Sequence, residues 1–287
     1  MIQRTAVKIM AVPGFSLSLA LALCLCFHTL GTAQTPTALA PEPTGVIRLR
    51  VRVAAGDGAK ATGLARKRFY LIKGSLEQNK TLIQAIEQQS VISRDCYYRS
   101  IGASEALIAW LKQKDCESVY CREVEPEDVE GGAAVPEFQR AVAAGEKEFG
   151  SKDLARKWLA VNLTEDLRSG FYTKQQQRLR ELVAWAEEIS KAKVASVMTD
   201  SFGTAYFTDI EPGTYIISNL VPAELGTVGE IWNSEIKVKP GDLATELPFL
   251  ISNPGNKDPR DKKSIKRLSV ERSLPVCAPK VARASRP

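Results

Sequence analysis

Residues Val194–Leu220, VASVMTDSFGTAYFTDIEPGTYIISNL, indicate the fold class better than any other part of the chain. This stretch opens with a turn signal, Thr199–Gly203. The Asp200 carboxylate can accept hydrogen bonds from backbone amides two residues on, and Gly203 can adopt a positive φ. The short run Ala205–Thr208 that follows is rich in residues that favour strands. The first half of the stretch therefore predicts a turn followed by a strand.

The second half repeats this order. Pro212 presets φ for a turn, and Gly213 predicts the left-handed position after it. Thr214–Ile217 then reads as the returning strand. Two short strands joined by a turn of this length predict either a hairpin or the corner of a β-sandwich.

The two turns and the strands beside them resemble a known family of domains. The pattern TD-x-x-G, a short aromatic strand and PGTY resembles the carboxypeptidase regulatory-domain-like family. The resemblance implies a transthyretin-like, antiparallel β-sandwich of about seven strands and no particular activity, because such modules serve many functions. It covers about Thr44–Gly74 and Val194–Ser252. Phe202 stands where the family usually has a polar turn residue, and we expect it to cover one end of the core.

Two strands precede the quoted stretch. In Val46–Val53, Ile, Leu and Val alternate with Arg48, Arg50 and Arg52, which predicts one buried and one wet face. That arginine face either binds an anionic partner or is simply solvated. In Arg68–Lys73, Phe69 and Leu71 point to one face and the residues between them to the other.

Residues 75–193 change to a helical period and predict an all-α subdomain inserted into the sandwich. We expect helices over 76–92, 105–114 (capped by Ser104), 136–149, 152–161 and 173–191. After the quoted stretch, alternation over 232–239 and 247–251 predicts the closing strands. The fold class is therefore α+β, with the sandwich formed by 44–74 and 194–252.

The N-terminus predicts export. Arg4 and Lys8 precede an apolar run of about 16 residues, shorter than the roughly 20 that span a bilayer. Residues 1–33 therefore read as a signal peptide, cleaved after Ala33 or Ala40, and 34–43 as a linker. An N-terminal anchor is the alternative, and Leu23 before Cys24 disfavours a lipoprotein. We expect no transmembrane segment after signal removal, and a location in the periplasm, cell envelope or extracellular space.

Charge is concentrated at the C-terminus. Residues 256–287 hold ten Lys/Arg and three Asp/Glu, whereas 34–255 hold 27 basic and 30 acidic residues. We expect 253–287 to be a basic, disordered tail. For an exported chain, an envelope protein or a polyanionic cell-surface polymer is the partner that this composition suggests, and no nucleic acid is expected.

The mature chain contains no histidine, because the one histidine, His28, falls in the signal. This excludes Ser-His-Asp and Cys-His catalysis and zinc sites with histidine ligands. We identify no catalytic, cofactor-binding or metal-binding residues and expect no cofactor. The acidic loop 123–130 lacks the ligand order of a calcium loop and predicts a solvated loop.

Four cysteines remain after signal removal and are disulfide candidates: Cys96, Cys116, Cys121 and Cys277. Three connectivities are possible. We expect one bond among the first three cysteines, which flank one short helix. The remaining cysteine either pairs with Cys277 or stays free.

These observations favour an exported, non-catalytic bacterial envelope protein, a binding or structural module that presents a helical insert to an unknown partner. The alternative is a carboxylate-dependent hydrolase acting on carbohydrate, with its site between the insert and the sheet. That activity would need two carboxyl groups about 5–10 Å apart across a cleft.

Overall fold

The computed structural model describes residues 43–54, 59–242, 248–255, 265–267 and 269–277. The predicted signal peptide, and the linker up to residue 42, lie outside the described residues. The described part of the chain is mixed α+β, as expected. Its strands are β1 (Gly45–Val53), β2 (Thr62–Gly63), β3 (Arg68–Lys73), β4 (Ala195–Met198), β5 (Thr204–Ile210), β6 (Gly213–Ser218), β7 (Ala223–Leu225), β8 (Val228–Ile231), β9 (Asn233–Val238), β10 (Phe249–Ser252), β11 (Ile265–Arg267) and β12 (Val270–Ser273).

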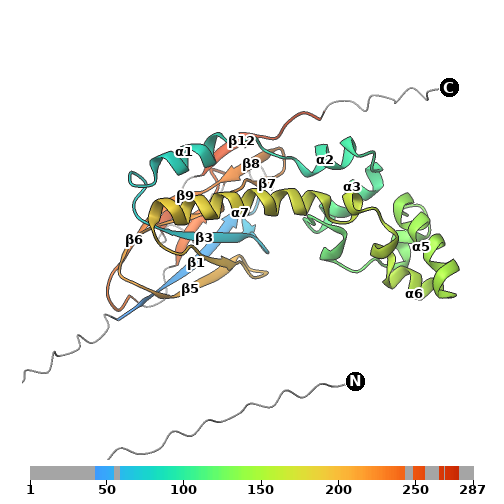
Figure 1. The fold of residues 1–287 in the computed structure, drawn as a ribbon, viewed down its shortest axis with the longest axis horizontal. Helices are drawn as coiled ribbons and strands as arrows, with labels where there is room; N and C mark the ends of the chain where they lie inside the picture. Colours follow the sequence, from blue (N-terminus) through green and yellow to red (C-terminus); the bar gives the residue numbers. More distant parts are fainter. Residues whose placement is uncertain (1–42, 55–58, 243–247, 256–264, 268, 278–287) are drawn as a thin grey trace, which may run out of the picture. The chain divides into compact units, whose positions relative to one another are not determined.

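The strands form three sheets (Figure 1). The first has the order β11-β10-β1-β2, with β5 also pairing with β1, and the second has the order β4-β3-β6-β9. A third, smaller sheet has the order β12-β8-β7. The prediction of a purely antiparallel fold is wrong, because β10 runs parallel to both β1 and β11. A parallel partner requires a long connection, and residues 54–248 separate β1 from β10.

The first two sheets share a core. Alternate residues of β1, from Ile47 to Val53, pack with Phe69 and Leu71 of β3 and with the indole of Trp232. The alternation predicted for β1 is therefore confirmed. Arg52 is the exception on the other face, since it is buried and donates from Nη2 to the Ala61 carbonyl (2.7 Å).

The corner at 199–213 follows the sequence in part. Asp200 Oδ1 accepts hydrogen bonds from the amides of Phe202 and Thr204 (2.8 Å each), and Gly203 has a φ of +76°. Strand β5 pairs with β1, whereas β6 pairs with β3 and β9, so the turn connects two different sheets and is not a hairpin.

Two predictions for this corner, the left-handed Gly213 and the buried Phe202, are wrong. Gly213 begins β6, and the positive φ before the turn falls on Asp209 instead (+57°). Phe202 covers no core, because its side chain is 77% exposed. The backbone carbonyl of Phe202 lies against Gly63, where a side chain would clash with it, while the Phe202 ring is in solvent.

The helices of the described chain all lie between β3 and β4. They are α1 (Lys80–Gln88), α2 (Arg94–Ser100), α3 (Glu105–Gln113), α4 (Pro126–Val129), α5 (Pro136–Phe149), α6 (Lys152–Lys157) and α7 (Phe171–Ser190), with short 3-10 turns at Val119–Cys121 and Leu159–Asn162 and a π-helical turn at Asp166–Gly170. The predicted helix over 136–149 and the Ser104 cap of α3 are confirmed. The helix predicted to reach residue 161 ends at Lys157.

The helices divide between two cores. Leu82 and Ile86 of α1 and Leu182 of α7 pack on Tyr70 and Ile72, the outward face of β3. The other helices build their own core around Tyr98, Trp110 and Phe138. Helix α7 therefore joins the two regions, since it starts in the second core with Phe171 and ends on the sheet (Figure 1).

The prediction that residues 253–287 are disordered is wrong for the part of the tail that the structure describes. Residues Val270–Ser273 form β12, which pairs with β8 in antiparallel register, and Val270 packs against the core under α1 and α7. The remaining tail residues 256–264, 268 and 278–287 lie outside the described chain. The composition of this segment predicts disorder, but pairing with β8 and the Cys96–Cys277 disulfide hold it in place.

Candidate functional site

The two disulfides bracket the region where helices meet sheet. Cys116 and Cys121 join across five positions (Cα–Cα 5.6 Å), and Cys96 joins Cys277 across 181 (Cα–Cα 4.9 Å). One bond thus lies among the three cysteines of the insert, as expected, and the other attaches the tail to α2. Paired cysteines of this kind fit an exported protein.

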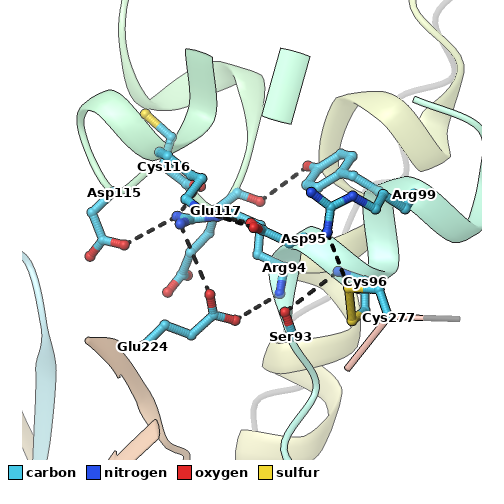
Figure 2. A network of polar contacts seen from close by, with 12 residues as sticks. Ser93, Arg94, Asp95, Cys96, Arg99, Asp115, Cys116, Glu117, Glu224 and Cys277 are labelled. Carbon is cyan, nitrogen blue, oxygen red and sulfur yellow. Dashed lines mark hydrogen bonds and ion pairs between the residues drawn. A yellow bond between two sulfur atoms is a disulfide. The ribbon is translucent and has the colours of Figure 1, made fainter. Parts of the chain in front are cut away.

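Arg94, at the start of α2, is the centre of a polar network at this junction (Figure 2). Its side chain is only 7% exposed, and Nη1 lies 3.1 Å from both Asp115 Oδ1 and the Cys116 carbonyl. Nη2 lies 3.9 Å from Glu224 Oε2 of β7, while the Arg94 amide donates to Glu224 Oε1 (2.7 Å). The network therefore ties α2 and the end of α3 to the third sheet.

Lys67 continues this network onto the second sheet. Its Nζ lies 2.8 Å from Asp115 and 3.6 Å from Glu117. Burial alone lowers the pKa of Lys67, but the two carboxylates more than offset it, so the pKa is raised. The pKa of the Glu224 carboxyl is also raised, but here the cause is burial, which outweighs the lowering effect of the nearby Arg94. Lys67 therefore remains charged and holds the loop after α3 against β3.

Three cavities lie along this junction. The largest, about 640 Å³, is lined by residues of the β2–β3 turn, the loop after α3 and the turn after β4. A second, about 350 Å³, contains Arg94, Asp115 and Glu224, and a third, about 170 Å³, lies between β3 and α7. Arg66, Lys67, Glu117 and Tyr172 line both the largest and the smallest cavity. We call these two adjoining cavities the junction groove.

The carboxylates of the junction surround cations. Asp115 and Glu224 both contact Arg94, and Glu117 contacts Lys67. This arrangement favours a structural clamp over a pair of opposed acid and base groups. Among the described residues there is no group of three or more side chains placed to hold a metal ion. In the predicted solvated loop, Glu125 and Asp128 serve as the capping box of α4.

Sequence reasoning missed the residues that line the groove. The run Arg66–Arg68, which leads into β3, was a visible signal, since three consecutive basic residues begin a strand with two buried faces. Tyr172, Gln175 and Gln176 carried no signal, because only the fold brings the start of α7 beside β3. Among the tryptophans, Trp110 and Trp232 are buried, whereas Trp158 is 59% exposed.

Comparison with known proteins leaves the chain without an assigned family. No family model matches it, and no curated protein matches it. Among solved structures, it is similar to the pilus backbone protein RrgB from Streptococcus pneumoniae, with 10% identity and a TM-score of 0.23. That match covers 78% of this chain, which spans 40% of the pilus protein. Within the described residues, every helix is too short or too polar to cross a bilayer.

Proposed function

We propose that this chain is an exported, non-catalytic binding protein of the bacterial cell envelope, and that the junction groove holds its partner. The observation that carries the proposal is the groove itself. Cations, amides and an exposed tyrosine line it, and two lining residues, Lys67 and Asp115, are fixed by ion pairs with each other and with Arg94. Ligand sites are usually largely pre-formed and present a small number of placed polar groups.

The proposal includes the family suggested by the sequence, a transthyretin-like sandwich carrying a helical insertion. Two facing sheets with a shared core and the corner at 199–213 support it. The parallel pairing of β1 with β10 and the larger number of described strands are departures from the expected pattern. On this view the sandwich is the scaffold, and the insert supplies one wall of the binding groove.

Site-specific photocrosslinking in the envelope tests the proposal. A photoreactive residue is placed at Ser201 or Gln176, which line the groove, and at exposed control positions Lys147 of α5 and Lys237 of β9. We expect a discrete adduct from the groove positions and none from the controls. Adducts from the controls alone, or from none of the four positions, would contradict a partner in the groove.

A hydrolase acting on carbohydrate is a second candidate, favoured by one observation. Glu224 lines the 350 Å³ cavity, and burial raises the pKa of its carboxyl in the direction that a general acid needs. Its contact with Arg94 argues the other way, since the cation stabilises the carboxylate. Release of reducing ends from envelope polysaccharide by the wild type, lost in Glu224→Gln, would establish this activity and displace the binding proposal.

A further inference from the structure

We propose that the smallest cavity of the junction groove binds a carboxylate-bearing sugar, such as a uronic acid unit of an acidic polysaccharide. This inference rests on the proposed function and names the ligand class of the same groove. We call the cavity the tyrosine pocket; it is lined by Tyr70, Tyr172, Arg66, Arg68, Gln175 and Gln176, among others, and measures about 170 Å³.

Tyr70 is the residue that points to a ligand. It is 7% exposed, and its ring packs in the core between β3, α1 and α7. It also lines the pocket, and its hydroxyl makes no hydrogen bond within the described chain. The hydroxyl at the cavity wall is therefore available to donate a hydrogen bond to a ligand in the pocket. Burial raises the pKa of Tyr70, which keeps the hydroxyl protonated and able to donate.

The pocket carries positive charge that the protein itself does not neutralise. Arg66 and Arg68 line it, and among the described residues neither forms an ion pair with a carboxylate. Glu117, the acidic residue of the lining, is already engaged by Lys67 (3.6 Å). A guanidinium group binds a carboxylate through two parallel hydrogen bonds, so this pair of arginines selects an anion with that planar shape.

The backbone presents one of these arginines in a fixed direction. Arg66 has a φ of +56°, which is uncommon for a residue with a side chain, and its amide is held by the Thr199 carbonyl (3.0 Å). Arg68 is steadied by Ser196, whose Oγ lies 3.1 Å from its Nη1. Strained, well-supported backbone of this kind is enriched at ligand sites.

The remaining lining residues favour a sugar over another anion. Tyr172 is 44% exposed, so its ring is available to pack on the apolar face of a pyranose. Gln175 and Gln176 offer both donors and acceptors, as hydroxyl groups require. The adjoining cavity of about 640 Å³ shares Arg66 and Tyr172, so neighbouring units of a polymer have room beside the bound one.

Isothermal titration of the purified mature protein with trigalacturonic acid tests this, with maltotriose as the neutral sugar and tri-glutamate as the acidic peptide. We expect binding of trigalacturonic acid and at least tenfold weaker binding of the other two. Tyr70→Phe removes only the hydroxyl and should weaken binding about two- to tenfold. The double variant Arg66→Gln, Arg68→Gln should weaken it by more than tenfold.

Arg180→Gln provides the matched control. Arg180 is exposed on α7, the helix that supplies Tyr172 and Gln176 to the pocket, but does not itself line the pocket. It should bind as the wild type does, and unfolding midpoints of all variants establish that each is folded. Equal binding of maltotriose, preference for tri-glutamate, or no binding at millimolar ligand would overturn the sugar assignment. If photocrosslinks from Ser201 or Gln176 are still formed in those cases, a partner binds in the groove and only the assignment of an acidic sugar is wrong.

Discussion

Arg94 is the residue on which the junction depends most. Its guanidinium is buried among Asp115, Glu224 and a backbone carbonyl, so its removal takes the cation away from Glu224 and leaves Asp115 with Lys67. Breaking a buried pair by removing one partner typically costs about 3–5 kcal/mol. We expect Arg94→Met to lower the free energy of unfolding by about that amount in urea titrations.

Arg178→Met is the control for this prediction. Its pair with Glu181 is 39% and 54% exposed, and exposed pairs contribute about 1 kcal/mol at most. The control should therefore lose less than about 1 kcal/mol. Equal losses in the two variants would show that the Arg94 network is not a structural clamp.

Glu230 makes stability depend on pH. It is fully buried on β8, directly opposite Glu271 of β12, and Ser269 donates to it. Burial, with a further contribution from Glu271, raises the pKa of Glu230 to about 7 from its ordinary value of 4.5. The folded state thus binds a proton that the unfolded state releases first, so stability falls as pH rises from about 4.5 to 7 and stays low above that.

We expect the loss attributable to Glu230 to be no more than about 3 kcal/mol. Glu230→Gln should flatten the decline of the unfolding free energy between pH 5 and pH 8, because an amide does not titrate. Glu188→Gln, at an exposed position on α7, should leave the decline unchanged. An unaltered decline in Glu230→Gln would assign the pH dependence to other groups.

The conformation of a single residue could be predicted from the sequence where it depends on neighbouring residues, and not where it depends on distant ones. The Asp200 turn and the Gly203 conformation follow from residues within four positions, so both could be predicted. The free hydroxyl of Tyr70 could not, since it depends on α7 packing beside β3 from about 100 residues away in sequence.

Helix α7 is the element that joins the helical core to the sheets. Leu182 is 1% exposed and packs with α1 and the outer face of the second sheet. Leu182→Ala should therefore cost about 2–5 kcal/mol of unfolding free energy, measured by urea denaturation. Leu154→Ala is the same change at a side chain that is 46% exposed on α6, and it should cost under about 1 kcal/mol. Similar losses would contradict a continuous core across α7 and the sheet.

Elements with strong periodicity were predictable, and those held by distant partners were not. The inward face of α7 and both faces of β3 follow their apolar pattern. Strand β12 reads VERS, which has no strand signal of its own, and it forms because β8 offers an edge and Cys277 is anchored to α2. Helix α2, capped by Ser93, is short and polar on much of its surface, so its pattern was too weak to predict.

At the scale of the whole molecule, the disulfides differ in what they constrain. Cys96–Cys277 closes a loop of 181 positions and Cys116–Cys121 one of five. Closing the longer loop restricts the unfolded chain more, by about 3 kcal/mol in the chain-entropy description. We expect Cys96→Ser with Cys277→Ser to lower the unfolding free energy more than Cys116→Ser with Cys121→Ser. The reverse order would show that the tail attachment contributes little to stability.

Hydrogen–deuterium exchange shows directly whether binding occurs in the junction groove. The purified mature protein is compared with and without polygalacturonate. We expect slower exchange in the segment 64–72 and in the first half of α7, with little change in α5 and β9. Protection confined to the basic tail 256–287, or to faces outside the groove, would contradict it.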